Sequence, residues 1–231
     1  MGGDAAGGVS DAAATARVRA LGATATLLAL GGIATAVLLD PTFSWTSDAL
    51  SDLGVREPSA AVFNWGLILG GAVGVGYAVE LGRSVDAPAG AFRAAVVALA
   101  MVAMAGVGAF DLTESLHGPS AVGFYALVTV AFAVDGTVRR ATATGRTTLA
   151  FVPVHVAVWT TFLAGWWPVT GLALPESPGA LMLAAWVWLL GPAPVLGSVG
   201  RRLDGAGTDG GGSVGSDTDG SDTDGSDTDG H

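Results

Sequence analysis

The stretch Leu21-Gly-Ala-Thr-Ala-Thr-Leu-Leu-Ala-Leu-Gly-Gly-Ile-Ala-Thr-Ala-Val-Leu-Leu39 has no charged residue and nothing more polar than threonine. A helix of about 20 apolar residues crosses a hydrocarbon core about 30 Å thick. Five further apolar runs follow, at 60–81, 94–110, 121–138, 149–167 and 180–199. Helices are expected because backbone groups in lipid need hydrogen-bond partners within their own segment. The sequence therefore predicts an all-α, polytopic membrane protein with six transmembrane helices in one bundle.

The composition agrees with this class and sets the domain limits. Of the 231 residues, 51% are hydrophobic and 13% are charged, whereas an ordinary soluble domain has about 25% charged residues. The runs fill residues 21–200, which leaves an N-terminal segment at 1–20 and a tail at 201–231. The chain has no cysteine, which excludes disulfides, thiolate catalysis and Cys-ligated metal sites. No nucleic-acid partner is expected.

The arginines predict which side of the membrane each connection occupies. Nine of the ten basic residues precede the first run, follow the last, or flank and fill the second and fourth connections; only Arg56 lies on the other side. Because arginine-rich segments stay inside, both termini are predicted to be cytoplasmic, in a multi-pass protein of the cell membrane. The outer face is then acidic, and its carboxylates are Asp40, Asp48, Asp52, Glu57, Asp111, Glu114 and Glu176.

The first run has an alternative interpretation as a cleavable signal peptide. Arg17 and Arg19 precede it, and Ala34-Thr35-Ala36 resembles a cleavage site. The run is as long as a membrane span and continues past that site, which favours a retained helix.

The tail carries most of the net negative charge, which is −10 for the whole chain. Eight of the 20 acidic residues lie in the last 28 positions, and Ser-Asp-Thr-Asp-Gly repeats three times over 216–230. A disordered, acidic cytoplasmic tail is predicted because such a segment cannot bury enough apolar surface to fold. Calcium binding is the alternative, but the spacing matches neither the EF-hand nor the nonapeptide repeat. The lysine-free, Ala/Gly/Asp-rich composition is typical of an extreme halophile, which suggests a halophilic archaeon.

The first outer connection, from Asp40 to Ser59, is too patterned for a flexible linker. Pro41 ends the first helix, and Gly54 with Pro58 predicts a turn before the second. Between them, residues 47–53 are expected to form a short helix with Ser47 as its N-cap.

This connection resembles a family of six-span membrane proteins known as domain of unknown function 998. The resemblance covers residues 21 to about 200 and is carried by a Ser-Asp-Leu-Gly element, a Phe-Asn pair with glycines after it, and a histidine before the fourth run. The matching residues are Ser51, Asp52, Leu53, Gly54, Phe63, Asn64, Gly66, Gly70, His117 and Gly118. The resemblance implies a six-span architecture and no established activity. A similar Ser-Asp-x-Gly element occurs in the six-span group of GPI-anchor-remodelling and autophagy-modulator proteins.

The outer connections also hold the candidate catalytic residues. Carboxylates beside one imidazole are able to bind a divalent cation or to act as an acid/base pair, and a nearby serine is able to act as a nucleophile. The candidates are His117, Asp111, Asp52, Asp48 and Ser51, with Ser47, Glu57 and Glu114 beside them. The preferred interpretation is structural: Asp48 and Asp52 as caps or turn formers, with Arg56 neutralising them. No metal site and no cofactor is assigned.

Three ionisable groups fall inside the apolar runs. Glu80 lies three residues before Arg83, and Asp135 lies four before Arg139, so each pair shares a helix face and is expected to be structural. His155 has no charged neighbour in sequence. It is either a proton-relay or substrate residue or, preferably, a neutral imidazole that bonds across the bundle.

Glycines at 66, 70 and 74 recur every four residues along the second run, where they allow another helix to approach closely. Packing within one chain is preferred over a dimer interface.

Three functions remain open from the sequence. The first is a non-enzymatic membrane protein whose acidic outer face contacts lipid headgroups or a partner protein. The second is a membrane-embedded lipid-modifying enzyme that uses the outer acidic cluster and His117. The third, a small-solute or proton-coupled carrier built around His155, is the least favoured because the chain shows no internal repeats.

Overall fold

The computed structural model describes residues 3–84 and 87–206, and this part of the chain consists of helices and connections without a strand. The predicted acidic repeats lie outside the described residues. The helices are α1 (Gly3–Leu39), the 3-10 helix η1 (Leu50–Gly54), α2 (Ala60–Arg83), α3 (Pro88–Ala109), α4 (His117–Val138), α5 (Ala143–Leu163), α6 (Ala173–Ala185), the π-helix η2 (Trp186–Leu190) and α7 (Gly197–Ala206).

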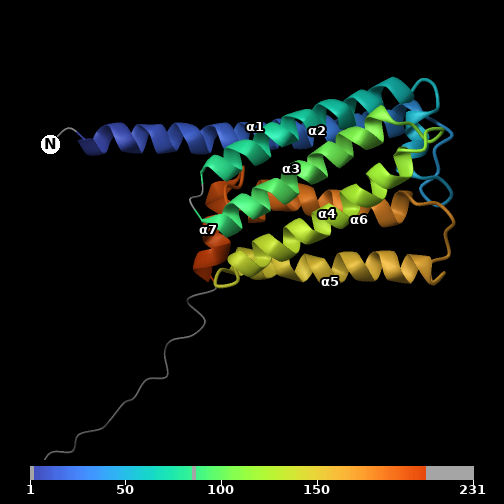
Figure 1. Cartoon of the computed structure of the whole chain (residues 1–231). Helices are drawn as coiled ribbons and strands as arrows, with labels where there is room; N and C mark the ends of the chain where they lie inside the picture. The colour runs from blue at the N-terminus through green and yellow to red at the C-terminus, as the bar shows by residue number, and fades with distance from the viewer. Residues whose placement is uncertain (1–2, 85–86, 207–231) are drawn as a thin grey trace, which may run out of the picture.

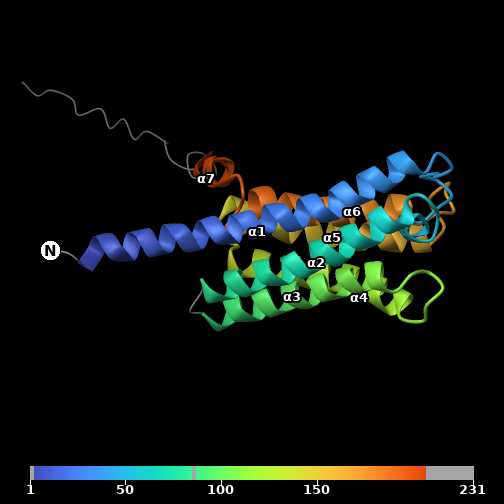
Figure 2. The same cartoon turned by 90° about the horizontal axis from the view of Figure 1, so that it is seen from above.

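Helices α1 to α6 lie side by side in one bundle and alternate in direction (Figures 1 and 2). From α1 to α5 each helix packs against the next one in the chain, and α6 with η2 contacts α1, α4 and α5 to close the bundle. The short helix α7 lies across the end of the bundle where α5 begins (Figure 1). The first connection and the one between α5 and α6 meet at the opposite end.

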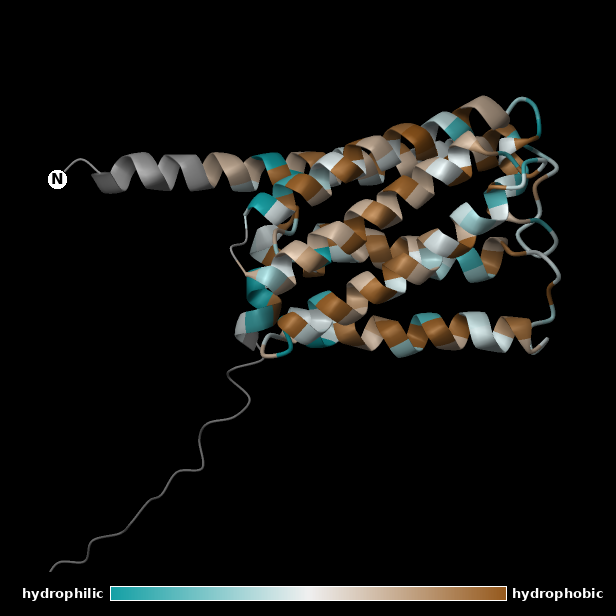
Figure 3. Ribbon diagram, viewed as in Figure 1, coloured by the Kyte–Doolittle hydropathy of each residue, from teal (hydrophilic) through white to brown (hydrophobic). Residues whose placement is uncertain are grey.

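Five segments are long and apolar enough to cross a membrane: Ala12–Leu39, Ala60–Arg83, Pro88–Ala109, His117–Val138 and Ala173–Leu190. Hydrophilic residues gather at the two ends of the bundle, while hydrophobic residues follow its length (Figure 3). Large apolar side chains such as Leu38, Val122 and Leu163 are exposed on the helices. Exposed apolar surface of this kind suits contact with lipid, so the chain is a membrane protein with transmembrane helices.

Three apolar runs differ clearly from the helices that form. The first was expected at 21–39, after a separate segment at 1–20, whereas α1 begins at Gly3. The fifth run was expected at 149–167, whereas α5 begins at Ala143 and ends at Leu163. The sixth was expected at 180–199, whereas α6 begins at Ala173 and its π-helical continuation ends at Leu190. Pro175 lies in the first turn of α6, where a backbone N–H has no helical partner to lose, so this proline does not delay the helix. Gly191, Pro192 and Pro194 follow η2 and end it.

The tail was predicted to begin at residue 201. Residues 201–206 instead belong to α7. The Asp204 carboxylate accepts a hydrogen bond from the Thr144 backbone N–H at 2.8 Å and one from the Thr144 hydroxyl at 3.2 Å. These bonds hold α7 against the start of α5.

The glycines of α2 allow close packing on two sides. A methyl group added to Gly66 would lie 2.9 Å from Cα of Gly32 in α1, and one added to Gly74 would lie 2.5 Å from the Met101 sulfur in α3. Any side chain at Gly66 would therefore push α1 and α2 apart. These contacts give the glycine repeat a packing role within one chain.

Candidate functional site

The family-motif residues fold the first connection onto the start of α2. The Asn64 side chain donates a hydrogen bond from Nδ2 to the Gly54 carbonyl at 2.9 Å, and a methyl group on Gly54 would lie 2.6 Å from Asn64 Oδ1. Leu53 and Phe63 are both buried. The buried Ser59 hydroxyl donates to the Leu53 carbonyl at 2.9 Å, a contact that the sequence did not suggest. The motif therefore has a structural role in shaping this connection.

Arg56 lies among three carboxylates of the same connection. Its guanidinium donates to both oxygens of Asp48, at 2.9 and 3.1 Å, and lies 3.5 Å from Asp40 and 3.9 Å from Asp52. The hydrogen bond from Arg56 holds the pKa of the Asp48 carboxyl below its ordinary value. Hydrogen bonds from Thr42 lower the pKa of Asp40 in the same way, together with a smaller contribution from Arg56. These contacts thus stabilise the charged forms of Asp40 and Asp48.

Two of the outer acids, Asp52 and Asp111, accept hydrogen bonds within local turns. Asp52 accepts the Ala49 backbone N–H at 2.8 Å and so caps η1, whose N-cap is Ala49 rather than the expected Ser47. The short helix spans Leu50–Gly54 because Asp48 is bound to Arg56 and Ser44, which keeps the preceding residues in a turn. Asp111 accepts the backbone N–H and the hydroxyl of Thr113, at 2.8 and 2.6 Å, and the hydroxyl bond lowers its pKa.

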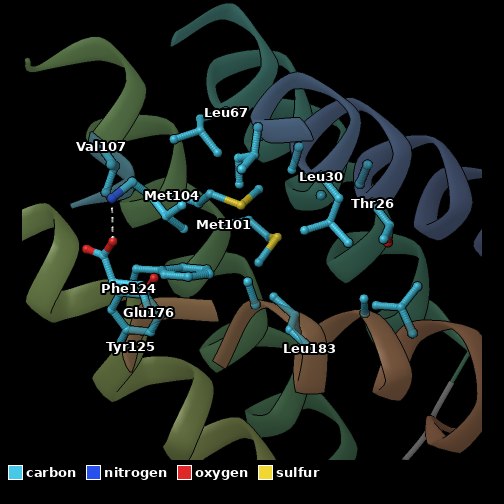
Figure 4. A pocket seen from close by; sticks show the side chains of 18 of the residues that line it. Thr26, Leu30, Leu67, Met101, Met104, Val107, Phe124, Tyr125, Glu176 and Leu183 are labelled. Carbon is cyan, nitrogen blue, oxygen red and sulfur yellow. Dashed lines mark hydrogen bonds between the residues drawn. The ribbon is translucent and has the colours of Figure 1, made fainter. Parts of the chain in front are cut away.

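A cavity of about 90 Å³ lies inside the bundle between α1, α2, α3, α4 and α6, and we call it the central cavity. Its wall is almost entirely apolar and includes the flexible side chains of Met101 and Met104 (Figure 4). On α1 the lining extends from Gly22 to Ile33, which corresponds to about 17 Å along the helix. Helix α5 does not contribute to the lining.

Polar groups gather at the end of the central cavity beneath the first connection. Ser51, His117 and Glu176 all line it and are all buried. The Glu176 carboxylate accepts the Leu50 backbone N–H at 2.8 Å, the bond drawn in Figure 4. His117 uses Nδ1 to bond the Phe110 carbonyl at 2.7 Å, so that in the neutral ring this nitrogen is the donor. An apolar cavity with polar groups at one end matches the shape of an amphiphile.

The structure thus divides the candidate catalytic residues into two groups. Ser51 and His117 share the central cavity, whereas Asp48, Asp52 and Asp111 bind neighbouring loop groups. Glu176 was predicted only as part of the outer face, because the sixth helix was expected to begin after it. Within residues 3–84 and 87–206, no group of three or more His, Asp or Glu side chains is suited to hold a metal ion.

A second polar cluster is buried toward the other end of the bundle. Asp135 of α4 binds Arg93 of α3 at 3.0 Å, binds Arg139 through both carboxylate oxygens, and accepts the Trp186 indole N–H at 2.7 Å. The sequence predicted the Asp135–Arg139 pair, and it also predicted the Glu80–Arg83 pair, which forms at 2.7 Å. It missed Arg93, which was expected at a helix end and is instead only 3% exposed.

Both ring nitrogens of His155 are bonded, Nδ1 across the bundle to α4 and Nε2 within α5. Nδ1 lies 2.8 Å from the Thr129 hydroxyl, which itself donates to the Tyr125 carbonyl, and Nε2 accepts the Trp159 indole N–H at 3.1 Å. The Thr129 oxygen is therefore the acceptor and Nδ1 the donor, an arrangement that needs a neutral ring. His155 does not line the central cavity.

Comparison with known proteins agrees with the resemblance seen in the sequence. The family model described as protein of unknown function (DUF998) matches residues 23–193. No curated protein and no solved structure matches the chain, and the likeness to the GPI-anchor-remodelling group gains no support. The matched range contains the motif residues and most of the lining of the central cavity. Because this range covers well over half of the chain, the chain belongs to the DUF998 family of proteins of unknown function.

Proposed function

We propose that this chain is a non-enzymatic, six-span membrane protein that binds one amphiphile, with the apolar chain in the central cavity and the polar head at its outer end. The observation that carries the proposal is the distribution of polarity around the cavity. Its wall is apolar over about 17 Å of α1, and the buried carboxylate of Glu176 lies at one end. Such sites are mostly apolar, with a few polar groups that fix orientation.

The cavity must widen to admit a hydrocarbon chain. Its volume of about 90 Å³ is smaller than the roughly 150 Å³ of a cavity that holds benzene. Met101 and Met104 line the cavity, and methionine side chains are unbranched and adapt readily to a new neighbour. Movement of these two side chains would enlarge the cavity.

Hydrogen bonds at both ends of α5 support a sixth crossing, although this helix has the polar residues Thr144, Arg146 and His155. At its start, the Thr144 backbone bonds Asp204 of α7. At its end, the N–H groups of Thr170 and Gly171 both donate to the Thr46 carbonyl, at 3.0 Å each. The connection after α5 therefore lies with the connection after α1, at the other end of the bundle from α7.

The distribution of charged residues supports the predicted orientation of the bundle in the membrane. Arg139 at the end of α4 and Arg201 in α7 lie at one end of the bundle, whereas the opposite end carries the carboxylates around Arg56. The positive-inside tendency then puts both termini in the cytoplasm and the polar end of the central cavity at the outer surface of the cell membrane.

Native mass spectrometry of the detergent-purified full chain tests the binding proposal, with palmitoyl lysophosphatidylcholine as the probe. Ala121 lines the central cavity, whereas Ala126 on the same helix is exposed. We expect one bound probe per chain in the wild type and in Ala126→Phe, and loss of binding in Ala121→Phe. Equal binding by both phenylalanine variants would contradict the proposal.

A lipid hydrolase is the second candidate function, because Ser51 and His117 line the same cavity. With Nδ1 donating to Phe110, Nε2 of a neutral His117 is left as a base, and a base must come within hydrogen-bond reach of its nucleophile. No hydrogen bond joins Ser51 to His117 among the described contacts, which is why binding is preferred.

Lipid analysis of a deletion strain separates the two candidate functions. For a hydrolase, the deletion would change the lipid profile, and only the wild type, not Ser51→Ala or His117→Ala, would restore it. The binding proposal expects Ser51→Ala and His117→Ala to behave as the wild type does.

A further inference from the structure

A second cavity, of about 330 Å³, lies between α7, the connection before it, Arg19 of α1 and the connection after α4, and we call it the α7 cavity. Its volume falls within the range of about 300–1,000 Å³ that is usual for small-molecule sites. Unlike the central cavity, it is lined by charged and hydroxyl side chains, which include Arg19, Arg139, Arg201, Thr142, Thr144 and Asp204.

Two of these arginines converge on one point. A methyl group added to Gly197 would lie 2.6 Å from Nη2 of Arg19 and 3.5 Å from Nη1 of Arg201. The two nitrogens are therefore within about 6 Å of each other. Two guanidinium groups this close repel one another unless an anion lies between them.

Within the described residues, neither Arg19 nor Arg201 has a carboxylate within 4.0 Å, and the Nε of Arg19 is buried without a hydrogen-bond partner. The other charged groups of the cavity make contacts of their own. Arg139 is bound to Asp135 and the Leu190 carbonyl, and Asp204 is bound to Thr144. Arg19 and Arg201 therefore share the cavity with one carboxylate, that of Asp204, and the cavity keeps a net positive charge.

The start of α7 adds backbone N–H groups as further hydrogen-bond donors. This ten-residue helix begins at Gly197, and Gly197 and Gly200 both line the cavity. Of its first four N–H groups, those of Val199 and Gly200 donate to the Leu196 carbonyl, which leaves those of Gly197 and Ser198 without a partner within the helix, and the N-terminus of a helix favours negative charge. Together with two guanidinium groups, these N–H groups suit a tetrahedral oxyanion that accepts several bonds at once.

The surface of α7 indicates where such an anion would come from. Leu196, Val199 and Leu203 are exposed and recur at spacings of three and four residues, which makes one face of α7 apolar. A short helix with an apolar face and arginines on its other side lies in the membrane interface. Basic pockets at that level between transmembrane helices bind anionic lipid headgroups.

We propose that Arg19, Arg201 and the first turn of α7 form a binding site for a phosphate group, carried by an anionic phospholipid headgroup. A soluble phosphate ester presents the same chemistry, so the test separates the two sources. This site is independent of the central cavity, and failure of one proposal leaves the other standing.

The test measures binding to the full chain by native mass spectrometry in a phosphate-free detergent solution. The probes are phosphatidylglycerol, a diacylglycerol with the same acyl chains, and inorganic phosphate. We expect phosphatidylglycerol to bind and diacylglycerol not to bind. Tighter binding of phosphatidylglycerol than of inorganic phosphate assigns the site to lipid, whereas equal affinities assign it to soluble phosphate. Equal binding of phosphatidylglycerol and diacylglycerol would overturn the proposal.

Neighbouring arginines supply a matched control. Arg17→Gln/Arg202→Gln removes two exposed charges from the same helices as Arg19→Gln/Arg201→Gln. The Arg19/Arg201 variant should weaken phosphatidylglycerol binding about 10- to 100-fold, and the control should stay within about twofold of the wild type. Equal losses in the two variants would mean unspecific charge attraction and would overturn the proposal.

A second variant, which keeps every charge, tests the same site without removing an arginine. Gly197→Ala places a methyl group against the Arg19 guanidinium and should also weaken binding. Thermal unfolding in the absence of lipid shows whether each variant is folded. If Gly197→Ala and Arg19→Gln/Arg201→Gln are folded and bind as the wild type does, the site is not at these residues.

Discussion

Replacing Asp135 with asparagine should destabilise the protein more than any other single change of a carboxylate to an amide. Asp135 is fully buried and is bound to Arg93, Arg139 and Trp186. Asparagine keeps the shape and one acceptor oxygen, but it removes the negative charge between two guanidinium groups. Arg93 is only 3% exposed and has no other ion-pair partner among the described residues, so its charge is left buried and uncompensated.

The size of the effect follows from this burial. Breaking a buried ion pair by removing one partner costs about 3–5 kcal/mol, because the remaining charge keeps its desolvation penalty. For a chain of this length, about 2–4 °C of Tm corresponds to each kcal/mol, so Tm should fall by about 6–20 °C.

The control is Glu80→Gln, which makes the same chemical change in an ion pair whose arginine, Arg83, is 71% exposed. Exposed pairs contribute about 0–1 kcal/mol, so this variant should unfold close to the wild type. Unfolding in mixed micelles, titrated with a denaturing detergent and followed by tryptophan fluorescence, gives the free energy of unfolding of each protein. If Asp135→Asn and Glu80→Gln lose the same stability, the buried network does not hold α3, α4 and η2 together as described.

Three further changes test other parts of the structure by the same unfolding assay. Gly66→Ala forces a methyl group against Gly32 and should lower the free energy of unfolding by about 1–3 kcal/mol. The control, Gly76→Ala, has its nearest neighbour at 3.9 Å and should cost little. Equal losses of stability in the two variants would refute the close approach of α1 and α2. Asn64→Ala leaves the Gly54 carbonyl without its side-chain donor and should cost about 1–3 kcal/mol, and an unchanged stability would show that this bond does not hold the first connection. Arg56→Gln should lower stability near pH 6, and the difference from the wild type should shrink as the pH falls below 3.8, because Asp48 has a pKa below that ordinary value in the folded state and its contribution is lost as the pH falls through the lowered pKa. A stability difference that does not change with pH would contradict this interpretation.

The helices were largely predictable, because long apolar runs without charge determine where a chain crosses lipid. The errors lie where polar or helix-breaking residues are accommodated by tertiary contacts. Pro175 and Glu176 resemble loop residues, yet they form the first turn of α6, where the proline loses no hydrogen bond and the carboxylate binds the Leu50 N–H. Arg201 resembles the start of a polar tail, yet α7 continues through it because Asp204 binds Thr144.

The candidate site was less predictable than the fold. Ser51 and His117 were proposed from the sequence, and the central cavity brings both together, but nothing in the sequence paired them with Glu176. Arg93 and Asp135 are separated by 42 residues, and their contact depends on how α3 packs on α4. The α7 cavity likewise joins Arg19 and Arg201 from opposite ends of the chain. Contacts of this kind depend on three-dimensional packing, which no local pattern reports.

The central claim is that the chain crosses the membrane six times, with the first connection outside. Because the chain has no cysteine, single cysteines introduced at exposed positions report their side directly in intact cells treated with a membrane-impermeant maleimide. Thr46→Cys, Thr113→Cys and Thr170→Cys should be labelled, whereas Ser84→Cys and Ala141→Cys should be labelled only after the cells are lysed. Protection of Thr170→Cys while Thr46→Cys and Thr113→Cys are labelled would mean that α5 does not cross, and it would contradict the account.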